Sequence, residues 1–393
     1  MTESVAGKPA SLVPFSALSA SYFAHIGFFN PYLPLWLKDL GLSLIAISLL
    51  TSVQAATRLF APYGWGALSD RTGERVKLLR YCASVALATS FALWWHGGTA
   101  WIAIVLLVMF THTSSMMPMS EAAMAHLVSQ GGAFDAKRYG RVRLWGSCGF
   151  LVTVFFAGNW FEHFGMQHFP MWTSLTIAAV VFSVWRMPDL KEAAAKAGEH
   201  VAILPILRQR EVQWFFASLF FHVLSHMSVY VFFSLYLDSL GYSKTMIGVG
   251  WAMSVIVEIT WFFTQSRWLP LMSLTAWLVL ASVTMALRMG LTATGAALLP
   301  VLLFAQALHA LTFAAHHSVC IALLSHHFPG RLRGRGQALY TVVGYGFPGV
   351  LGGLVGGVLS SHYGLASVFY VTTATSLVAT CCAWQVWRKR HPG

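Results

Sequence analysis

The chain alternates between long runs of apolar residues and short polar intervals. An α-helix rises about 1.5 Å per residue, so about 20 apolar residues cross the roughly 30 Å hydrocarbon core of a bilayer. Runs of this length recur along all 393 residues. The pattern predicts an all-α membrane protein with twelve transmembrane helices, at 13–37, 43–68, 76–96, 99–128, 139–161, 168–187, 212–237, 243–266, 269–291, 296–325, 334–360 and 364–387.

One short motif occurs twice. Leu35-Trp-Leu-Lys-Asp-Leu-Gly-Leu-Ser43 is followed 200 residues later by Leu235-Tyr-Leu-Asp-Ser-Leu-Gly-Tyr-Ser243, and five of the nine positions match. Each copy ends one apolar run and opens the next. The longest polar interval separates six spans from six. The sequence therefore predicts two pseudo-symmetric six-helix bundles, 1–188 and 212–393, joined by a linker at 189–211.

The composition agrees with a lipid environment. The residues are 57% hydrophobic and only 10% charged, whereas soluble domains carry about 25% charged residues. The five cysteines fall within apolar runs and show no CxxC spacing, which indicates packing rather than disulfides or metal ligands. No small-residue cleavage site follows a short apolar core near the N-terminus, so no removable signal peptide is expected.

The basic residues predict the orientation. The chain has a net charge of +12, and most of its 25 Lys and Arg lie in alternate connections, in the linker and near both termini. Loops rich in Lys and Arg stay in the cytoplasm. Both termini and the linker are therefore predicted to be cytoplasmic, in a multi-pass protein of the bacterial inner membrane. Because topology accounts for these basic residues, no nucleic-acid partner is expected.

Four charged residues lie well inside the predicted spans, where a charge costs several kcal/mol unless it is paired or faces a cavity. They are Arg58, Glu121, Glu258 and Arg288, and Arg58 stands 200 residues before Glu258. Burial disfavours a charged carboxylate and a neighbouring Arg favours it. A carboxyl balanced between these effects is suited to load and release a proton. The alternative is a buried ion pair that only fixes helix packing.

Histidines add further candidates within the spans. His309 is a candidate functional residue, with a hydrogen-bonded packing residue as the alternative. His316 and His317 point about 100° apart on a helix, so at most one of them faces a site. His222 and His226 share a helix face at a spacing that can hold a metal. No carboxylate or Cys accompanies this pair, so no metal site is predicted.

Glycines and aromatic residues complete the candidates. Gly349, Gly353 and Gly357 follow the GxxxG spacing that lets membrane helices approach closely. We interpret this stretch as a packing surface rather than a phosphate loop. Most aromatic residues must face lipid or core, but several are available to offer a ring to a substrate, namely Tyr22, Tyr32, Trp36, Phe150, Tyr230 and Tyr236.

The connection between the second and third spans carries a family motif. Gly66-Ala-Leu-Ser-Asp70-Arg71-Thr-Gly73-Glu-Arg75 resembles the signature loop of the major facilitator superfamily, and twelve spans in two halves fit that superfamily over the whole chain. The resemblance implies a gating role on the cytoplasmic side for this loop, including Gly66, Asp70, Arg71 and Gly73. By composition alone, Asp70 and Arg71 would be an ordinary turn.

Within the superfamily, the chain resembles lactose permease and, more closely, the phenylpropionate permease group of proton symporters. The matching motifs occur in the family's order and are Pro31-Tyr-Leu-Pro34, Pro118-Met-Ser-Glu121, Gly140-Arg-Val-Arg143-Leu-Trp-Gly146-Ser, Glu258, Arg288 and Gln306-Ala-Leu-His309. Two positions depart from lactose permease. Thr312 stands where that protein has its proton-carrying acid, and Phe150 stands where a Trp stacks on the sugar. Both departures resemble the phenylpropionate permease group, which makes a sugar substrate less favoured.

Taken together, these features predict a proton-coupled secondary active transporter, a symporter that works by alternating access. The expected substrate is a small organic solute, foremost an aromatic carboxylate of the phenylpropionate type. Arg141 and Arg143 begin the fifth span as either loop or site residues, and with Arg143 the candidate membrane arginines (Arg58, Arg143 and Arg288) outnumber the acids (Glu121 and Glu258). The predicted substrate-binding residues are Glu121, Arg143, Phe150 and Arg58, and the predicted proton-coupling residues are Glu258, Arg288 and His309. Arg143 is expected to bind a substrate oxygen bidentately. Sugars or glycosides, nucleosides, and an uncoupled facilitator or exporter are the alternatives.

An enzyme is not expected, because neither HExxH nor GxSxG occurs in the chain. No cofactor is predicted, and the proton gradient supplies the coupling ion. The expected partners are the small-molecule substrate and the lipid bilayer, with the chain acting as a monomer.

Overall fold

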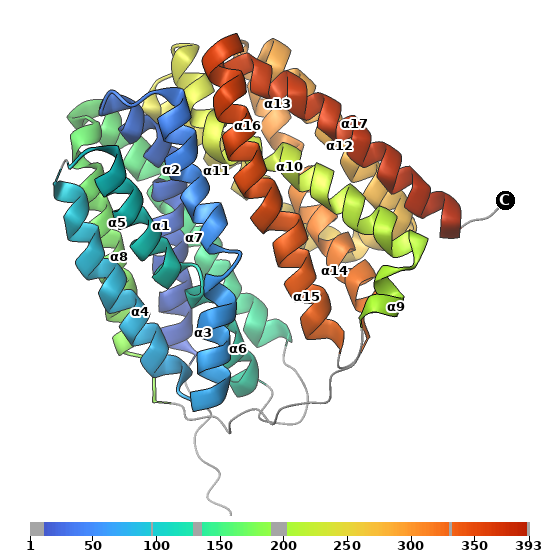
Figure 1. The fold of residues 1–393 in the computed structure, drawn as a ribbon, viewed down its shortest axis with the longest axis horizontal. Coiled ribbons are helices and arrows are strands. Elements are labelled where there is room, and N and C mark those ends of the chain that lie inside the picture. The colour runs from blue at the N-terminus through green and yellow to red at the C-terminus, as the bar shows by residue number, and fades with distance from the viewer. Residues whose placement is uncertain (1–11, 96, 129–135, 190–202, 330–331, 391–393) are drawn as a thin grey trace, which may run out of the picture.

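The computed structural model describes residues 12–95, 97–128, 136–189, 203–329 and 332–390. These residues are helical apart from short connections, and the helices form two bundles (Figure 1). The N-terminal bundle lies on the left of the view and the C-terminal bundle on the right. The predicted all-α fold with two helical halves is confirmed.

The N-terminal bundle contains six helical spans of membrane length. Its elements are α1 (Val13–Asp39), α2 (Leu44–Thr57), α3 (Ala61–Thr72), α4 (Arg75–Ser90), the 3-10 turn η1 (Phe91–Trp94), α5 (Gly98–Thr113), α6 (Met116–Val128), α7 (Ala136–Phe164), the 3-10 turn η2 (Met166–His168) and α8 (Phe169–Trp185).

The C-terminal bundle also contains six spans and is preceded by a short helix, α9 (Leu204–Leu207). Its elements are α10 (Arg210–Ser239), α11 (Lys244–Trp268), the 3-10 turn η3 (Leu269–Leu271), α12 (Leu274–Gly295), α13 (Leu299–Ala307), the π-helix η4 (Ala310–Ala315), α14 (His316–His327), α15 (Arg333–Thr341), the π-helix η6 (Val342–Gly346), α16 (Phe347–Tyr363) and α17 (Leu365–Arg390).

The observed spans match the predicted ones closely. In the described part of the chain, 11 helical stretches are long and apolar enough to cross a membrane. The remaining predicted span is α1, which has 27 residues but is less apolar because polar residues such as His25 and Asn30 interrupt it. Residues 190–202 of the predicted linker lie outside the described residues, so the domain boundaries remain predictions, as does the side of the membrane on which the termini lie.

Several spans are interrupted near their middle. α2 ends at Thr57 and α3 begins at Ala61, with Pro62 in the first turn of α3, where its missing N–H is not needed. In the C-terminal bundle, η4 and η6 widen two spans locally, and such π-helical segments often occur at functional sites. Arg58 caps the end of α2 and His309 caps the start of η4. Both candidate residues thus lie at helix interruptions.

The repeated motif forms the same turn in both halves. Gly41 and Gly241 have φ angles of 80° and 84°, in the left-handed region that ends helices and that side chains rarely adopt. Ser43 and Ser243 then cap the following helices, each accepting a hydrogen bond from the backbone N–H three residues later. The Gly-x-Ser part of the repeat is therefore a shared helix–turn–helix joint.

In the described residues, the main contacts between the two halves are those of α1 with α10, α7 with α11 and α2 with α16. At the α2–α16 contact, a Cβ atom on Gly353 would overlap the side chain of Ser52, and one on Gly357 would overlap Ser48. The close approach predicted from the GxxxG spacing is confirmed. It joins the two halves to each other.

One end of the molecule, which we call the closed end, is held together by hydrogen bonds between the halves. Tyr32 Oη donates to the Val154 carbonyl of its own half at 2.9 Å and to the Lys244 carbonyl of the other half at 3.2 Å. Glu162 accepts a hydrogen bond from the Lys244 backbone N–H at 2.6 Å. Toward the opposite end, Tyr63 Oη of α3 donates to the Ala338 carbonyl of α15 at 2.8 Å. Beyond this contact the ribbons of α3 and α15 draw apart (Figure 1), and we call this the divergent end.

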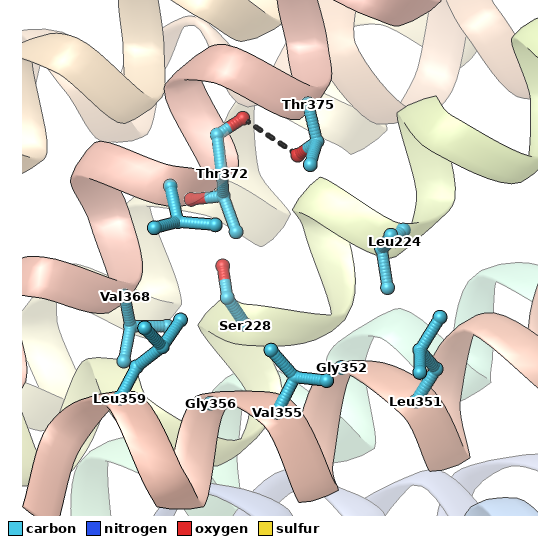
Figure 2. A pocket seen from close by; sticks show the side chains of 11 residues that line it. Leu224, Ser228, Leu351, Gly352, Val355, Gly356, Leu359, Val368, Thr372 and Thr375 are labelled. Atoms are coloured by element: carbon cyan, nitrogen blue, oxygen red, sulfur yellow. Dashed lines mark hydrogen bonds between the residues drawn. The ribbon is translucent and has the colours of Figure 1, made fainter.

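A partly open apolar cavity of about 130 Å³ lies between α10, α16 and α17 of the C-terminal bundle. Figure 2 shows the side chains around it, and Gly352 and Gly356 of α16 contribute no side chain to fill the space. None of the lining residues is charged. This cavity is therefore distinct from the charged groups described next.

Candidate substrate and proton site

Arg288 of α12 is fully enclosed within the C-terminal bundle, with 1% of its surface exposed. Its guanidinium donates hydrogen bonds to three acceptors at 3.0–3.1 Å, namely Gln306 Oε1, Thr312 Oγ1 and His309 Nδ1. Burying a charge is unfavourable unless it is hydrogen-bonded. The polar residues of the interrupted span α13–η4 supply these bonds.

His309 connects this arginine to Glu258 of α11. Arginine has no acceptor, so Nδ1 of His309 must accept from Arg288, and the neutral ring then carries its proton on Nε2. Nε2 lies 3.3 Å from Glu258 Oε2 and donates to it. The structure thus brings together the three predicted proton-coupling residues in one chain. The Glu258 side chain, 22% exposed, is its more accessible end.

Two aromatic rings hold His309 in position. Phe313 of η4 stacks on it with ring centroids 5.0 Å apart and planes within 5°. His226 of α10 stacks with centroids 5.4 Å apart. Phe313 was not predicted from the sequence. Its position four residues after His309 could have indicated the contact, because residues four apart lie on the same face of a helix.

The remaining histidines of this bundle separate into two environments. His222 and His316 stack with centroids 3.6 Å apart, and His222 Nε2 donates to the Thr312 carbonyl at 2.7 Å. His317 turns elsewhere, and its Nδ1 lies 2.9 Å from Tyr340 Oη. The prediction that His316 and His317 face different directions is confirmed. Within the described ranges, no group of three or more His, Cys, Asp or Glu gathers as a metal site.

Two tyrosines of the C-terminal half lie within electrostatic range of charges from both halves. Tyr230 of α10 and Tyr345 of η6 each interact electrostatically with both Arg58 and Glu258. Tyr345 Oη also lies 3.3 Å from Tyr340 Oη. Arg58 of the N-terminal half and Glu258 of the C-terminal half therefore border one region. Tyr340 and Tyr345 were not identified from the sequence, where their place beside a glycine-rich stretch was the only signal.

The other predicted substrate residues lie on the N-terminal bundle. Glu121 is half-buried on α6, and Phe150 is half-buried on α7, where it packs against the apolar core. Arg143 belongs to α7, but its side chain lies outside the described residues. Among the predicted substrate residues whose side chains are described, Arg58 is the one that shares tyrosine neighbours with Glu258.

Three aromatic residues were wrongly predicted to be available to a substrate. Tyr32, Trp36 and Tyr236 are buried in the core. Trp36 stacks on Phe169, and the hydroxyl groups of Tyr32 and Tyr236 donate to backbone carbonyls. The helices of this chain are apolar on most sides, so sequence periodicity could not distinguish a ring that faces a neighbouring helix from one that faces a cavity.

The signature loop forms a capped helix end. Asp70 pairs with Arg75 at 2.7 Å, and Arg75 also donates to Ser69. Gly73, with a φ of 67°, ends α3 in the left-handed region. Gly66 lies within α3 and Arg71 is exposed in its last turn. A gating role for this loop remains a prediction.

Apolar helices in two related bundles, with charged residues gathered at helix interruptions, are typical of membrane transport proteins. The chain belongs to the MFS_1 like family, whose model matches residues 16–371. It is a transporter of the major facilitator type. The resemblance to that superfamily is confirmed, and its relatives are transporters rather than enzymes.

Two relatives match most of the chain. The probable 3-phenylpropionic acid transporter of Escherichia coli (strain K12) is 25% identical over 364 residues, which cover 91% of this chain and 93% of that protein. The maltose permease of Geobacillus stearothermophilus is 26% identical over 369 residues, covering 91% and 89%.

Solved structures share the fold. A crystal structure of the nucleoside transporter NupG, in a mutant form, aligns with a TM-score of 0.85 and 16% identity over 95% of this chain and 99% of that one. A D-xylose–proton symporter aligns with a TM-score of 0.71 and 13% identity over 94% and 96%.

Proposed function

We propose that this protein is a proton-coupled symporter of a small aromatic carboxylate. The observation that carries the proposal is the chain Arg288–His309–Glu258, in which a partly exposed carboxylate ends a hydrogen-bonded line that begins at a fully buried arginine. The proton is the coupling ion, and no other cofactor is invoked.

The arrangement supports reversible protonation of Glu258. His309 donates a hydrogen bond that favours the charged carboxylate, and Arg288, behind His309, adds positive charge. Partial burial acts in the opposite direction and favours the protonated form. A substrate anion that enters beside Glu258 favours protonation further, because two negative charges repel each other. Binding of the anion and uptake of the proton are therefore linked.

The groups around Glu258 favour an aromatic anion. Arg58 supplies a positive charge from the other half, and the rings of Tyr230 and Tyr345 lie in the same region. We assign Arg143 and Glu121 to binding and orienting the substrate carboxylate, and Phe150 to contacting its ring. The similarity to a probable 3-phenylpropionic acid transporter supports this substrate class. Similarity to a maltose permease and to a nucleoside transporter makes neutral sugars and nucleosides the second candidate.

Transport by alternating access requires the halves to rock about the substrate site. We propose that these moving halves are 1–188 and 212–393, joined by the linker 189–211, with Gly66, Asp70, Arg71 and Gly73 gating the divergent end. That end bears the basic residues Arg71 and Arg75. We infer from the positive-inside rule that it faces the cytoplasm of a bacterial inner membrane.

The proposal is tested by uptake of 3-phenylpropionate into proteoliposomes that are acidic outside and neutral inside. The wild type should accumulate the solute. Glu258→Gln, which imitates the protonated carboxyl, should retain counterflow and lose accumulation. Asp189→Asn is the matched control, because Asp189 is 71% exposed and pairs with Arg80 far from this site. It should behave as the wild type.

Two other outcomes would contradict the proposal in different ways. Counterflow without accumulation in the wild type would indicate an uncoupled facilitator. Accumulation of maltose or uridine, but not of 3-phenylpropionate, would retain proton coupling and overturn the substrate class.

A further inference from the structure

His317, Tyr340 and Tyr345 form a hydrogen-bonded group that the proposed proton site does not include. His317 Nδ1 lies 2.9 Å from Tyr340 Oη, and Tyr340 Oη lies 3.3 Å from Tyr345 Oη. Tyr340 is 6% exposed and the other two side chains are half-buried. Imidazole and phenol groups can each accept one proton while donating another. A chain of such groups can therefore transfer a proton without any group moving far.

The two ends of this group lie in different places. His317 is eight residues beyond His309, or roughly 12 Å along the helix axis, in the direction of His327 and the divergent end. At the other end, Tyr345 interacts electrostatically with Glu258 and Arg58. The group thus extends from the neighbourhood of Glu258 toward the divergent end.

The π-helical segments border this group. η4 precedes α14, which begins at His316 and contains His317, whereas Tyr345 lies inside η6 and Tyr340 lies before it, in α15. A π-helical segment shifts the register of the residues that follow it. The direction in which His317 faces Tyr340 therefore depends on η4.

We propose that His317, Tyr340 and Tyr345 relay the coupled proton between Glu258 and the divergent end. This inference rests on the proposed function. For release, the proton of the Glu258 carboxyl passes through a bridging water to the Tyr345 oxygen, Tyr345 gives its own proton to the Tyr340 oxygen, and Tyr340 gives its own to Nδ1 of His317. His317 then gives a proton from Nε2 to water at the divergent end. Each transfer breaks one bond to hydrogen and forms another, so one proton moves in total and no group is oxidised or reduced.

The surroundings favour this route. The rings of His309, Phe313 and His317 stack in a line, but Phe313 has neither a donor nor an acceptor, so the stack itself conducts no proton. The titratable and charged groups that face the relay are Arg58, Tyr230, Glu258, His316 and Cys320. Among these, Glu258 is the group that the proposed function already assigns to proton loading.

The test compares two assays on the same proteoliposomes. Gradient-driven uptake requires net proton movement, whereas counterflow exchanges solute without it. We expect Tyr340→Phe and His317→Gln to lower gradient-driven uptake by about tenfold or more, since positioned proton-transfer groups contribute 10²–10⁴-fold. Counterflow should stay within about twofold of the wild type. The probe is 3-phenylpropionate, or maltose or uridine if the wild type takes up one of those instead.

Tyr242→Phe and His163→Gln are matched controls, because their polar atoms contact backbone carbonyls outside the relay. They should leave the ratio of the two rates unchanged. The relay would be wrong if both relay variants kept normal gradient-driven uptake, or if they lowered the rates of uptake and counterflow equally. Proton coupling through Glu258 would be unaffected by either result. A wild type that showed only counterflow would instead overturn the proposed function and the relay with it.

Discussion

Lys38 and Asp238 occupy the same position in the two copies of the repeated motif, and their side chains form an ion pair of 2.6 Å between the halves. The pair lies at the closed end, beside the hydrogen bonds of Tyr32 and Glu162. The side chains are 47% and 23% exposed. An ion pair this exposed to water contributes little to stability, which suits a contact that would break in each cycle of the proposed alternating access.

A double-mutant cycle at Lys38 and Asp238 should therefore measure a small coupling. Lys38→Ala, Asp238→Ala and the double variant are expected to give an interaction free energy of about 0.2–1 kcal/mol, measured by thermal unfolding in detergent. The charge-swapped variant, Lys38→Asp with Asp238→Lys, should transport as well as the wild type. A coupling of several kcal/mol would mean that this pair locks the closed end.

Tyr32→Phe should weaken the closed end more than the ion pair does. The change leaves the ring in place but removes the hydrogen bonds to the Val154 and Lys244 carbonyls, and a buried group left unpaired costs about 1–3 kcal/mol. Because the Lys244 contact exists only while the halves meet, the population should shift toward separation at this end. Distances between spin labels placed on the two halves would report the shift. Tyr236→Phe, whose hydroxyl bonds within one half, should not cause it.

Gly353→Ala should disturb the contact between the halves through steric overlap. A Cβ atom at this position meets Ser52 of the other half, and overpacking of this kind costs about 1–3 kcal/mol. Gly64→Ala is the control, since nothing lies within 4 Å of a Cβ there, and Ala is the better helix former. We expect a lower melting temperature for the first variant and an equal or higher one for the second. Equal melting temperatures would contradict the close contact.

Arg288→Lys should be destabilising although it conserves the charge. A lysine ammonium lacks the planar fork that lets Arg288 reach three acceptors from one position. At least one buried acceptor is then left unpaired, at a cost of about 1–3 kcal/mol. Arg267→Lys at the exposed end of α11 should change stability by less than about 0.5 kcal/mol. The measurement is the melting temperature of each purified variant relative to the wild type. A similarly small change in both variants would show that stability does not depend on the planar guanidinium of Arg288.

Much of the architecture could be predicted from the sequence, because a bilayer imposes strong constraints. Every span must be apolar and long, so the boundaries of the helices follow from the apolar runs. Charges inside such runs are rare, and for that reason Arg58, Glu258 and Arg288 stand out by composition alone. The repeat could be recognised in the sequence because a left-handed turn and a helix cap each need particular residues. These are Gly41 and Ser43 in the first copy and Gly241 and Ser243 in the second.

The contacts within the site were harder to predict. The positions of residues in η4 and η6 depend on which backbone N–H bonds to which carbonyl. Tertiary packing decides this hydrogen-bond register, and the spacing of apolar residues in the sequence does not reveal it. Tyr340 and Tyr345 were missed for that reason. Tyr32 and Trp36 were misassigned because an aromatic ring in an apolar helix looks the same in the sequence whether it faces a neighbouring helix, lipid or a cavity.

The glycines of α16 give this helix close neighbours on two sides. On one side, Gly353 and Gly357 bring α16 against α2 with no space for another methyl group. On the other, a Cβ atom on Gly356 would overlap the ring of Phe232 of α10. At these positions α16 has no free space toward either helix, so a displacement of α2 is passed on through α16 to α10. The glycine stretch thus mechanically couples the N-terminal half to the interior of the C-terminal bundle.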